Sequence, residues 1–512
     1  MQRPPQQADK AILILGAGPA GLSCAYELSK QRYLSTVWDK NEVVGGLART
    51  IEYRGYRFDI GPHRFFTKHD EVNALWHNVL GDDALRVNRL TRIFYNQTFF
   101  HYPLKPLNAL LGLGIGTSLR AVVSYLHAKY KLAGHTARNF EELVTKQFGA
   151  VLYRVFFKTY TEKVWGLPCT SIGAEWASQR IKGLSLGTAV WNALLGPRKG
   201  RRQIKTLIDC FDYPRTGAGL VYEKMSRTLT RFGSSIALNT TATVIHRRGN
   251  RITHVEAATP RGAVTTQVTH LFSSIPLTEF VLKLHPSAPE DVLEAARKLY
   301  YRDHITVNLI LSRRAIFPDN WIYVHSPNVR MARIADYGNF SEEMLATKDT
   351  TCISVEYFVF AHEDLWSLPD TDLVRLATEE LNTVGLVRPH EILDGFVVRE
   401  KDSYPVYYVG HRPLFEKIKN YVDGLENVTL IGRGGMYKYN NQDHSILTGL
   451  LAARKYLGES HNIWEINTDE DYHEEKHIES ERTADGDQIA NRAWHQSLNR
   501  DLEKSSPTTS LH

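Results

Sequence analysis

The stretch that decides the fold is "AILILGAGPAGLSCAYELSK", residues 11–30. Five apolar residues lead into a glycine-rich turn, and the pattern predicts a buried parallel strand followed by a helix. Gly16, Gly18 and Gly21 fit the GxGxxG fingerprint of a dinucleotide site. In that fingerprint the first glycine makes the turn, the second lets the backbone approach a pyrophosphate, and the third lets helix and strand pack closely. We expect the pyrophosphate at the helix N-terminus, where free N–H groups and the helix dipole favour negative charge.

The residues after this unit indicate which dinucleotide is bound. The segment "STVWDK", residues 35–40, predicts a second strand that ends in Asp39, where a carboxylate can accept hydrogen bonds from ribose hydroxyls. The segment "GGLART", residues 45–50, follows closely. A second glycine pair followed by an arginine suits a longer cofactor that lies back over the strand ends. We therefore predict FAD rather than NAD, and the alternative is a structural Rossmann domain without a cofactor.

Composition and charge exclude several other classes of protein. A net charge of +6 over 512 residues gives no indication of nucleic-acid binding. The four cysteines are widely separated and form no CxxC or Cys/His cluster, so we expect free thiols, a reducing compartment and no metal site. The start "MQRPPQQADK" lacks the apolar segment of a signal peptide, which favours a cytoplasmic location. The apolar run from Leu107 to Leu119 is too short to span a bilayer, and peripheral membrane contact stays an open alternative.

The stretch "FFKTYTEKVWG", residues 156–166, mixes aromatic and charged residues on both faces of the helix that it predicts. One interpretation is a half-buried helix whose long side chains lie along apolar surface. The other is the wall of a binding site, because a flat base favours an aromatic surface and cations suit a diphosphate. An isolated tryptophan in such a helix is more often part of the core.

This stretch and a second one resemble motifs of the FAD-dependent UDP-galactopyranose mutases, within the flavin-containing amine oxidase and protoporphyrinogen oxidase-like superfamily. "YTEKVWG" resembles "YTEKQWG" of that family, whose Tyr and Trp lie at the uridine of the sugar nucleotide. The resemblance thus implies that Tyr160 and Trp165 contact the substrate. "IGPHRFFT", residues 60–67, resembles "GPHIFHT", whose His lies against the flavin, and this implies the same place for His63.

Two further segments extend the resemblance. "KLYYRDHITV", residues 298–307, resembles the segment that carries one diphosphate-binding arginine, which implies this role for Arg302. "GRGGMYKYNNQDHS", residues 432–445, resembles "GRLGTYKYYDMD", the start of the closing flavin segment. Arg180 in "AEWASQRIKG" lies near a second arginine motif of the family. Arginine suits a diphosphate because its guanidinium donates two parallel hydrogen bonds. The alternative for each arginine is a surface ion pair, and it has more weight for Arg180 than for Arg302.

The resemblance and the fingerprint together give the predicted site. "YPRTGAGLVYEKMSRTLTRFGSSIALNTTATVIH", residues 213–246, looks like the superfamily's glycine-rich turn, helix and strand, which implies that Val244 lies near the adenine. The predicted cofactor-binding residues are Gly16, Gly18, Gly21, Asp39, Lys40, Gly45, Gly46, Leu47, Arg49, His63, Val244, Gly432, Arg433, Asn441 and Asp443. The predicted catalytic residues are His63, Arg180, Arg302, Tyr437 and Tyr439, and the predicted substrate contacts are Tyr160, Trp165, Arg180, Arg302 and Tyr439.

Two departures from the family pattern concern the reaction. Phe66 stands where the family motif has a second His, and Met331 replaces a substrate-contacting Tyr in "RMARIADYGN", residues 330–339. The resemblance implies a divergent sugar-nucleotide pyranose/furanose mutase, with a UDP-sugar as the small-molecule substrate and the N5 atom of reduced flavin as the nucleophile. The alternative is an FAD-dependent oxidoreductase, of the amine oxidase, protoporphyrinogen oxidase-like or desaturase-like kind, that acts on an apolar or amine substrate. A non-catalytic flavoprotein is a third alternative without specific support.

For the architecture we predict an α/β protein: a doubly wound, Rossmann-like FAD-binding domain with a helical insert and an antiparallel β-sheet substrate domain. Residues 461–512 read as a polar, acidic tail, and "NIWEIN", residues 462–467, is expected to dock on the body through Trp464 and Ile466. The expected ranges are 9–75, 205–285 and 425–460 for the discontinuous FAD domain, 76–204 for the insert and 286–424 for the β-rich domain.

Overall fold

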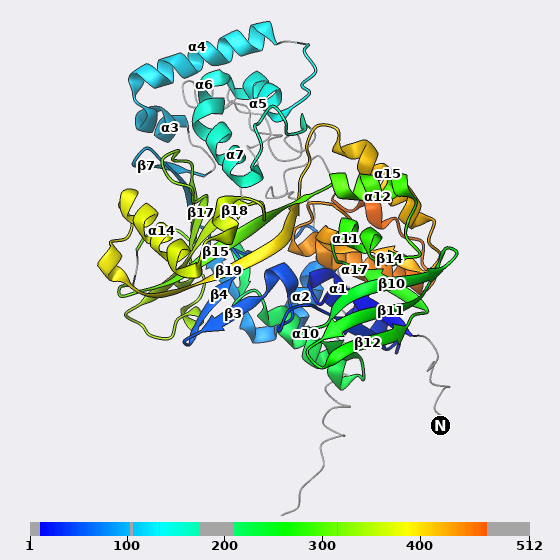
Figure 1. Ribbon diagram of the computed structural model, residues 1–512. Coiled ribbons are helices and arrows are strands. Elements are labelled where there is room, and N and C mark those ends of the chain that lie inside the picture. The colour runs from blue at the N-terminus through cyan, green and yellow to red at the C-terminus, as the bar shows by residue number, and fades with distance from the viewer. Residues whose placement is uncertain (1–10, 103–105, 133, 175–208, 315, 468–512) are drawn as a thin grey trace, which may run out of the picture.

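The computed structural model describes residues 11–102, 106–132, 134–174, 209–314 and 316–467 (Figure 1). At its centre lies a five-stranded parallel sheet in the order β20-β13-β1-β2-β9. Every residue of β1 is buried, because helices cover both faces of the sheet. The strands are β1 (Ile12–Leu15), β2 (Ser35–Trp38), β9 (Ser235–Ala237), β13 (His270–Ser273) and β20 (Val428–Leu430).

Three helices flank this sheet and bring distant parts of the chain together. Helix α1 (Pro19–Lys30) follows the glycine-rich turn, and α17 (Gln442–Tyr456) packs along it. Helix α10 (Leu220–Arg231) contacts α1 and α2 (Asp70–Leu80). The strand–turn–helix predicted from residues 11–30 is confirmed, and so is the doubly wound α/β class.

A smaller four-stranded sheet, β12-β11-β10-β14, extends the same part of the molecule. Its strands are β10 (Thr241–Arg248), β11 (Arg251–Thr259), β12 (Gly262–Gln267) and β14 (Leu284–His285). One face places Ile245, Ile252 and Val255 in the main hydrophobic core. Helices α11 (Leu277–Leu282) and α12 (Glu290–Lys298) follow in the chain.

A seven-stranded, mainly antiparallel sheet forms the second body of the molecule, in the order β19-β15-β18-β17-β16-β6-β7. Every residue of β15 (Tyr301–Leu311) and β18 (Thr351–Val359) is buried. Helix α14 (Asp370–Thr383) packs on β15 and β19. This sheet confirms the predicted antiparallel component. Its other strands are β6 (Thr91–Tyr95), β7 (Thr98–His101), β16 (Trp321–Val324), β17 (Arg333–Asp336) and β19 (Ile392–Pro405).

The region expected to be a helical insert, residues 76–204, contains strands after the end of α2. β5 (Ala84–Asn88) pairs with β8 (Cys210–Pro214), and β6 and β7 form a hairpin at the edge of the large sheet. The hairpin arises because "TRIFYNQTFF" has strand-type residues on both sides of a turn, in which Asn96 and Gln97 adopt positive φ. The helical part follows as α3 (Pro106–Leu113), α4 (Ile115–Lys131), α5 (Phe140–Phe148), α6 (Ala150–Leu152), a π-helical turn (Tyr153–Lys158) and α7 (Thr159–Trp165).

The remaining elements connect these layers. They are the hairpin β3 (Thr50–Tyr53) and β4 (Tyr56–Asp59), and the helices α13 (Asp364–Ser367), α15 (His411–Asp423) and α16 (Gly432–Gly435). In the described part of the chain, no helix has the length and apolar character needed to cross a membrane.

The segment "NIWEIN" docks on the body, as its apolar residues predicted. Ile463 and Ile466 are buried, and the Trp464 ring contacts Phe415 edge-on with ring centroids 6.0 Å apart. The Lys438 ammonium donates to the Trp464 carbonyl at 2.9 Å, which fixes the backbone of the segment. Residues 468–512 of the predicted tail lie outside the described residues.

Replacing Gly21 by alanine tests the close packing between α1 and the turn that precedes it. A Cβ at Gly21 would lie 1.9 Å from the carbonyl oxygen of Gly16. Because backbone atoms yield only at high cost, we expect Gly21→Ala to lower the free energy of unfolding by about 3 kcal/mol. Urea denaturation measures this change. The matched control is Gly116→Ala in α4, where a Cβ meets nothing within 4 Å. This variant should leave stability unchanged or raise it by up to about 1 kcal/mol, and equal losses in both variants would contradict the packing argument.

Candidate functional site

A cleft of about 440 Å³ runs along the carboxyl ends of the parallel strands, and ligands of open α/β sheets bind at such edges. The loops after β1 and β2 line one part of it. Further parts of its lining come from residues within 60–69, 400–404 and 432–445. Twelve predicted site residues line this cleft: Gly16, Gly18, Asp39, Lys40, Gly46, Leu47, His63, Gly432, Arg433, Tyr439, Asn441 and Asp443.

The two glycine pairs of the sequence pack against each other. Gly16 has a φ of 102° and Gly46 a φ of 54°, values that favour glycine. A Cβ at Gly46 would lie 3.1 Å from the Gly18 Cα, and the Gly45 amide donates to the Ala17 carbonyl at 2.8 Å. The second glycine pair therefore lets its loop touch the fingerprint turn. Gly21 and Gly45 shape the walls from behind and do not line the cleft themselves.

Asp39 is held rigidly at the end of β2. Its Oδ2 accepts a hydrogen bond from the Ala17 amide at 2.7 Å, and its Oδ1 accepts one from the Asn41 amide at 2.8 Å. The carboxylate is mostly buried and still borders the cleft. This is the position from which an acid can accept ribose hydroxyls, as the sequence predicted.

Two helix N-termini border the same cleft. Gly18 to Ala20 precede and begin α1, and Asn441 caps α17 in a capping box with His444. The first amides of a helix and its dipole favour an anion. Together with the glycine turns and Asp39, these ends fit a dinucleotide with its pyrophosphate at α1.

The two predicted arginines of the cofactor site have different surroundings. Arg49 is buried, pairs with Glu400 and donates to the Gly46 carbonyl at 2.9 Å, so it braces the glycine turn from outside the cleft. Arg433 lines the cleft, donates to the Asn440 carbonyl at 2.8 Å, and lies 4.9 Å from the Tyr404 ring centroid. Because the carbonyls and rings that it contacts are neutral, Arg433 brings a positive charge to the cleft wall.

His63 borders the cleft as a neutral imidazole. Burial is the main cause that lowers its pKa to about 4, and the positive charge of Arg433 adds to this. Its Nε2 lies 3.0 Å from the Ile60 carbonyl oxygen, which fixes the ring. At neutral pH His63 therefore offers a hydrogen-bonding ring and no charge.

Three predicted site residues lie behind the cleft wall: Tyr160 and Trp165, implied to contact the base, and Tyr437, predicted as catalytic. Trp165 belongs to the hydrophobic core of the helical part, and Tyr160 stacks on His325 with ring centroids 4.6 Å apart. Tyr437 is buried, and its hydroxyl donates to the carbonyls of Tyr300 and Val406 at 3.0 and 2.9 Å. None of these three lines the cleft, although Trp165 and Tyr160 contact rings that do.

Arg302 is also placed away from the cleft. Its Nη1 pairs with Glu363 at 2.5 Å, its Nη2 donates to the Phe358 carbonyl at 2.6 Å, and its Nε donates to the carbonyl of Val164 at 3.2 Å. The guanidinium lies 4.1 Å from the Phe360 ring centroid. Arg302 thus ties β15 to the end of α7 from inside the protein.

Val244 and Arg180 are the remaining predicted residues whose position bears on the cleft. The cleft is lined by Thr240, Thr241 and Ala242, whereas Val244 lies beyond them, after a register shift between Ala242 and Val244 in β10. Arg180 lies outside the described residues.

The far half of the cleft contains residues that the motifs did not single out as site residues. Arg333 lines it and forms two parallel hydrogen bonds with the fully buried Glu356, at 2.6 and 2.5 Å. Arg333 belongs to "RMARIADYGN", residues 330–339, two positions after Met331, so the sequence carried a signal for it. The other members are Arg64, Phe66, Trp321, Tyr323 and Tyr404.

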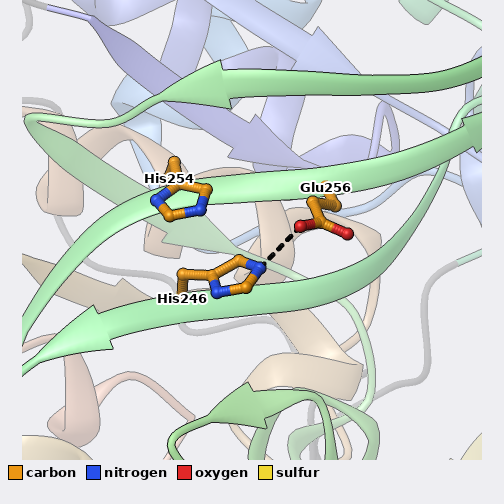
Figure 2. Close-up of side chains that lie close together, drawn as sticks. All are labelled: His246, His254 and Glu256. Atoms are coloured by element: carbon orange, nitrogen blue, oxygen red, sulfur yellow. Dashed lines mark hydrogen bonds and ion pairs between the residues drawn. The ribbon is translucent and has the colours of Figure 1, made fainter.

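A second cluster lies outside the cleft, on the β10–β11 hairpin (Figure 2). His246 and His254 stack with ring centroids 4.1 Å apart, and Nε2 of His246 lies 2.8 Å from Oε1 of Glu256. The sequence predicts no metal site, because its cysteines and histidines show no metal-ligand spacing along the chain. The strand pairing in the hairpin brings the three side chains together, since His246 lies opposite His254. Two imidazoles and a carboxylate are ligand types that a divalent metal accepts, and here two of them are joined by a hydrogen bond.

Comparison with known proteins agrees with this geometry. Residues 14–79 match the family described as NAD(P)-binding Rossmann-like domain. The chain is 43% identical over 72 residues to 1-hydroxycarotenoid 3,4-desaturase from Flavobacterium sp. (strain P99-3), a match to 14% of this chain and 15% of that protein. It is 29% identical over 176 residues to "Probable UDP-galactopyranose mutase" from Klebsiella pneumoniae, a match to 33% of this chain and 44% of that protein. The solved structure of reduced UDP-galactopyranose mutase superposes with a TM-score of 0.78 at 19% identity, over 90% of this chain and 96% of that one.

These findings establish the fold and the type of cofactor. The matches span less than half of the length of either curated relative. The structural likeness covers both bodies of the molecule and confirms the fold resemblance predicted from the motifs. The chain contains a Rossmann dinucleotide domain, and FAD is its cofactor. That the glycine turns, Asp39 and the N-terminus of α17 hold it stays a prediction, with which their place in the cleft is compatible.

Replacing Asp39 by alanine tests the cofactor site. The variant loses a carboxylate that orients the fingerprint turn and faces the ribose position, so we expect FAD affinity to fall at least about tenfold. Titration of the apoprotein with FAD, followed by flavin fluorescence, measures this. Glu42→Ala removes an exposed carboxylate from the same loop outside the cleft and should leave the affinity unchanged. Equal FAD affinity in the two variants would exclude Asp39 from the site.

Proposed function

We propose that this protein is a flavoenzyme that interconverts the pyranose and furanose forms of a nucleotide sugar. The observation that carries the proposal is the continuity of the cleft, which runs from the dinucleotide part into a part lined by rings and guanidinium groups. Rings suit a base or the face of a sugar, and guanidinium groups suit a diphosphate. The likeness in fold to reduced UDP-galactopyranose mutase, over 90% of this chain, supports the same proposal.

The residues of the cleft have tasks of position and charge in this reaction. FAD, when bound and reduced, supplies the nucleophile. Arg433, held between the carbonyl of Asn440 and the rings of Tyr404 and Tyr439, would stabilise the negative charge of the departing nucleoside diphosphate. His63 remains neutral and would orient the flavin or the sugar by hydrogen bonding without adding a second cation.

A second candidate function is an FAD-dependent oxidoreductase that acts on an apolar or amine substrate. The observation in its favour is the burial of Arg302 and Trp165, the residues implied to hold the diphosphate and the base. Without them, the cleft has fewer groups for a nucleotide than the mutase resemblance implied. The local match to a carotenoid desaturase, over 14% of this chain, is compatible with this alternative.

An activity assay separates the two functions. The protein is reduced with dithionite under anaerobic conditions and incubated with UDP-galactopyranose and related sugar nucleotides. We expect a furanose isomer in the chromatogram of the reduced sample and none in that of the oxidised sample. Failure to isomerise any sugar nucleotide, combined with flavin bleaching by an apolar or amine substrate, would support the oxidoreductase instead.

Replacing Arg302 and Arg433 separately tests which arginine meets the ligand. In Arg302→Ala the Glu363 carboxylate and two carbonyls lose their donor, so we expect the free energy of unfolding to fall by about 2–4 kcal/mol. Affinity for UDP should stay unchanged in the folded fraction. Arg433→Ala should weaken UDP binding at least about tenfold. Quenching of tryptophan and flavin fluorescence by UDP measures both. A loss of UDP affinity in Arg302→Ala as large as that in Arg433→Ala would place Arg302 in the ligand site.

A further inference from the structure

Helices α3 and α4 lie at the outer edge of the molecule (Figure 1). They present large apolar side chains to solvent. Ile115 is 90% exposed, Leu111 75% and Leu119 65%. The members on α4, from Ile115 onward, are three or four positions apart, a spacing that places them on one face of that helix, and Leu111 precedes them on α3. We call the set the apolar stripe, and its members are Leu111, Ile115, Leu119, Val123, Leu126 and Tyr130.

The side of α4 that faces the protein has small residues instead. Ser118, Ala121 and Ala128 are buried there, against α5 and α6. Gly149, which precedes α6, lies so close to α4 that a Cβ would meet the Tyr125 amide nitrogen at 2.7 Å. A surface helix of a soluble protein normally turns its large apolar residues inward, because their burial stabilises the fold. Packing among the residues that the structure describes therefore does not explain the apolar stripe, and such a patch indicates contact with another surface.

The charge of this region indicates what that surface is. Residues 102–138 contain Lys105, Arg120, Lys129, Lys131 and Arg138 and no aspartate or glutamate. The three cations on α4 are exposed beside the apolar stripe. An apolar face flanked by cations is the pattern of helices that lie on anionic membranes. A second copy of the same helix would bring like charges together, which disfavours self-association through this face.

We propose that α3 and α4 dock the protein on the surface of an anionic phospholipid bilayer. Helix α4 lies parallel to the membrane plane, with the apolar stripe at the boundary between headgroups and acyl chains. Its 17 residues span about 25 Å, and it carries three cations, so it lies on the membrane and does not cross it. This docking holds whichever reaction the cleft performs.

Co-sedimentation of the full-length holoprotein with vesicles tests the proposal. We expect little binding to phosphatidylcholine vesicles and strong binding when about a third of the lipid is phosphatidylglycerol, with a decrease at high salt. Ile115→Ser/Leu119→Ser should lower the partition coefficient at least about tenfold without changing the urea midpoint, because both side chains are exposed. Lys129→Glu/Lys131→Glu should remove the preference for anionic lipid.

A matched control and two outcomes make the test decisive. Leu393→Ser/Val409→Ser removes apolar side chains that are 58% and 56% exposed elsewhere on the surface, and it should bind vesicles like the parent. Equal partitioning of the parent and the Ile115→Ser/Leu119→Ser variant would overturn the proposal. So would a concentration-dependent dimer, seen by light scattering without lipid and abolished by the same variant, since the apolar stripe would then be an interface between two copies of the chain.

Discussion

The structure depends on one steric constraint, the close approach of three backbone segments around α1. Gly21 allows α1 to lie directly over the carbonyl of Gly16, and a Cβ there would be 1.9 Å from that oxygen. On the other side of α1, a Cβ at Gly449 of α17 would lie 2.2 Å from the Ala20 carbonyl oxygen. No side chain can enter either contact. Helix α1 is therefore packed closely between the turn after β1 and α17. As a result, segments from near both ends of the described chain line the cleft.

A buried carboxylate extends this arrangement to the second body of the molecule. Asp59, at the end of β4, accepts hydrogen bonds from the hydroxyls of Thr50 and Tyr213, both at 2.6 Å, and from the Ala218 amide at 3.0 Å. Tyr337, after β17 of the large sheet, donates its hydroxyl to the Asp59 carbonyl at 2.7 Å. Burial raises the pKa of the Asp59 carboxyl to about 6. The hydrogen bonds to the carboxylate fix Asp59 beside Thr50, Tyr213 and Ala218, and the bond from Tyr337 to its backbone carbonyl joins this group to the large sheet.

Local patterns in the sequence predicted most residues that line the cleft near the glycine turns, and fewer of those that line its other part. The fingerprint works because each glycine has a steric role that its immediate neighbours determine. The role of Arg302 depends on Glu363 and Phe358, which reach it through a loop and a strand far along the chain. The position of Val244 outside the cleft lining has a similar cause, since a bulge in β10 changes which residues reach the cleft. The hairpin of β6 and β7 lies directly before a long helical region, and a prediction for the whole range 76–204 does not separate the two.

The mixture of rings and charges in "YTEKVWG" has a structural explanation. Lys163 donates to the carbonyls of Val324, Ser326 and Met331 at 3.3, 2.6 and 3.1 Å, and burial lowers its pKa to about 8. These carbonyls belong to the end of β16 and the loop that leads to β17, so the charge fixes α7 to the large sheet. Tyr160 adds its stack on His325 in the same loop. Because β16 also carries Trp321 and Tyr323 of the cleft, α7 transmits the position of the helical part to the cleft wall. The motif "YTEKVWG" thus connects the helical part, which carries the apolar stripe, to the large sheet, which lines part of the cleft.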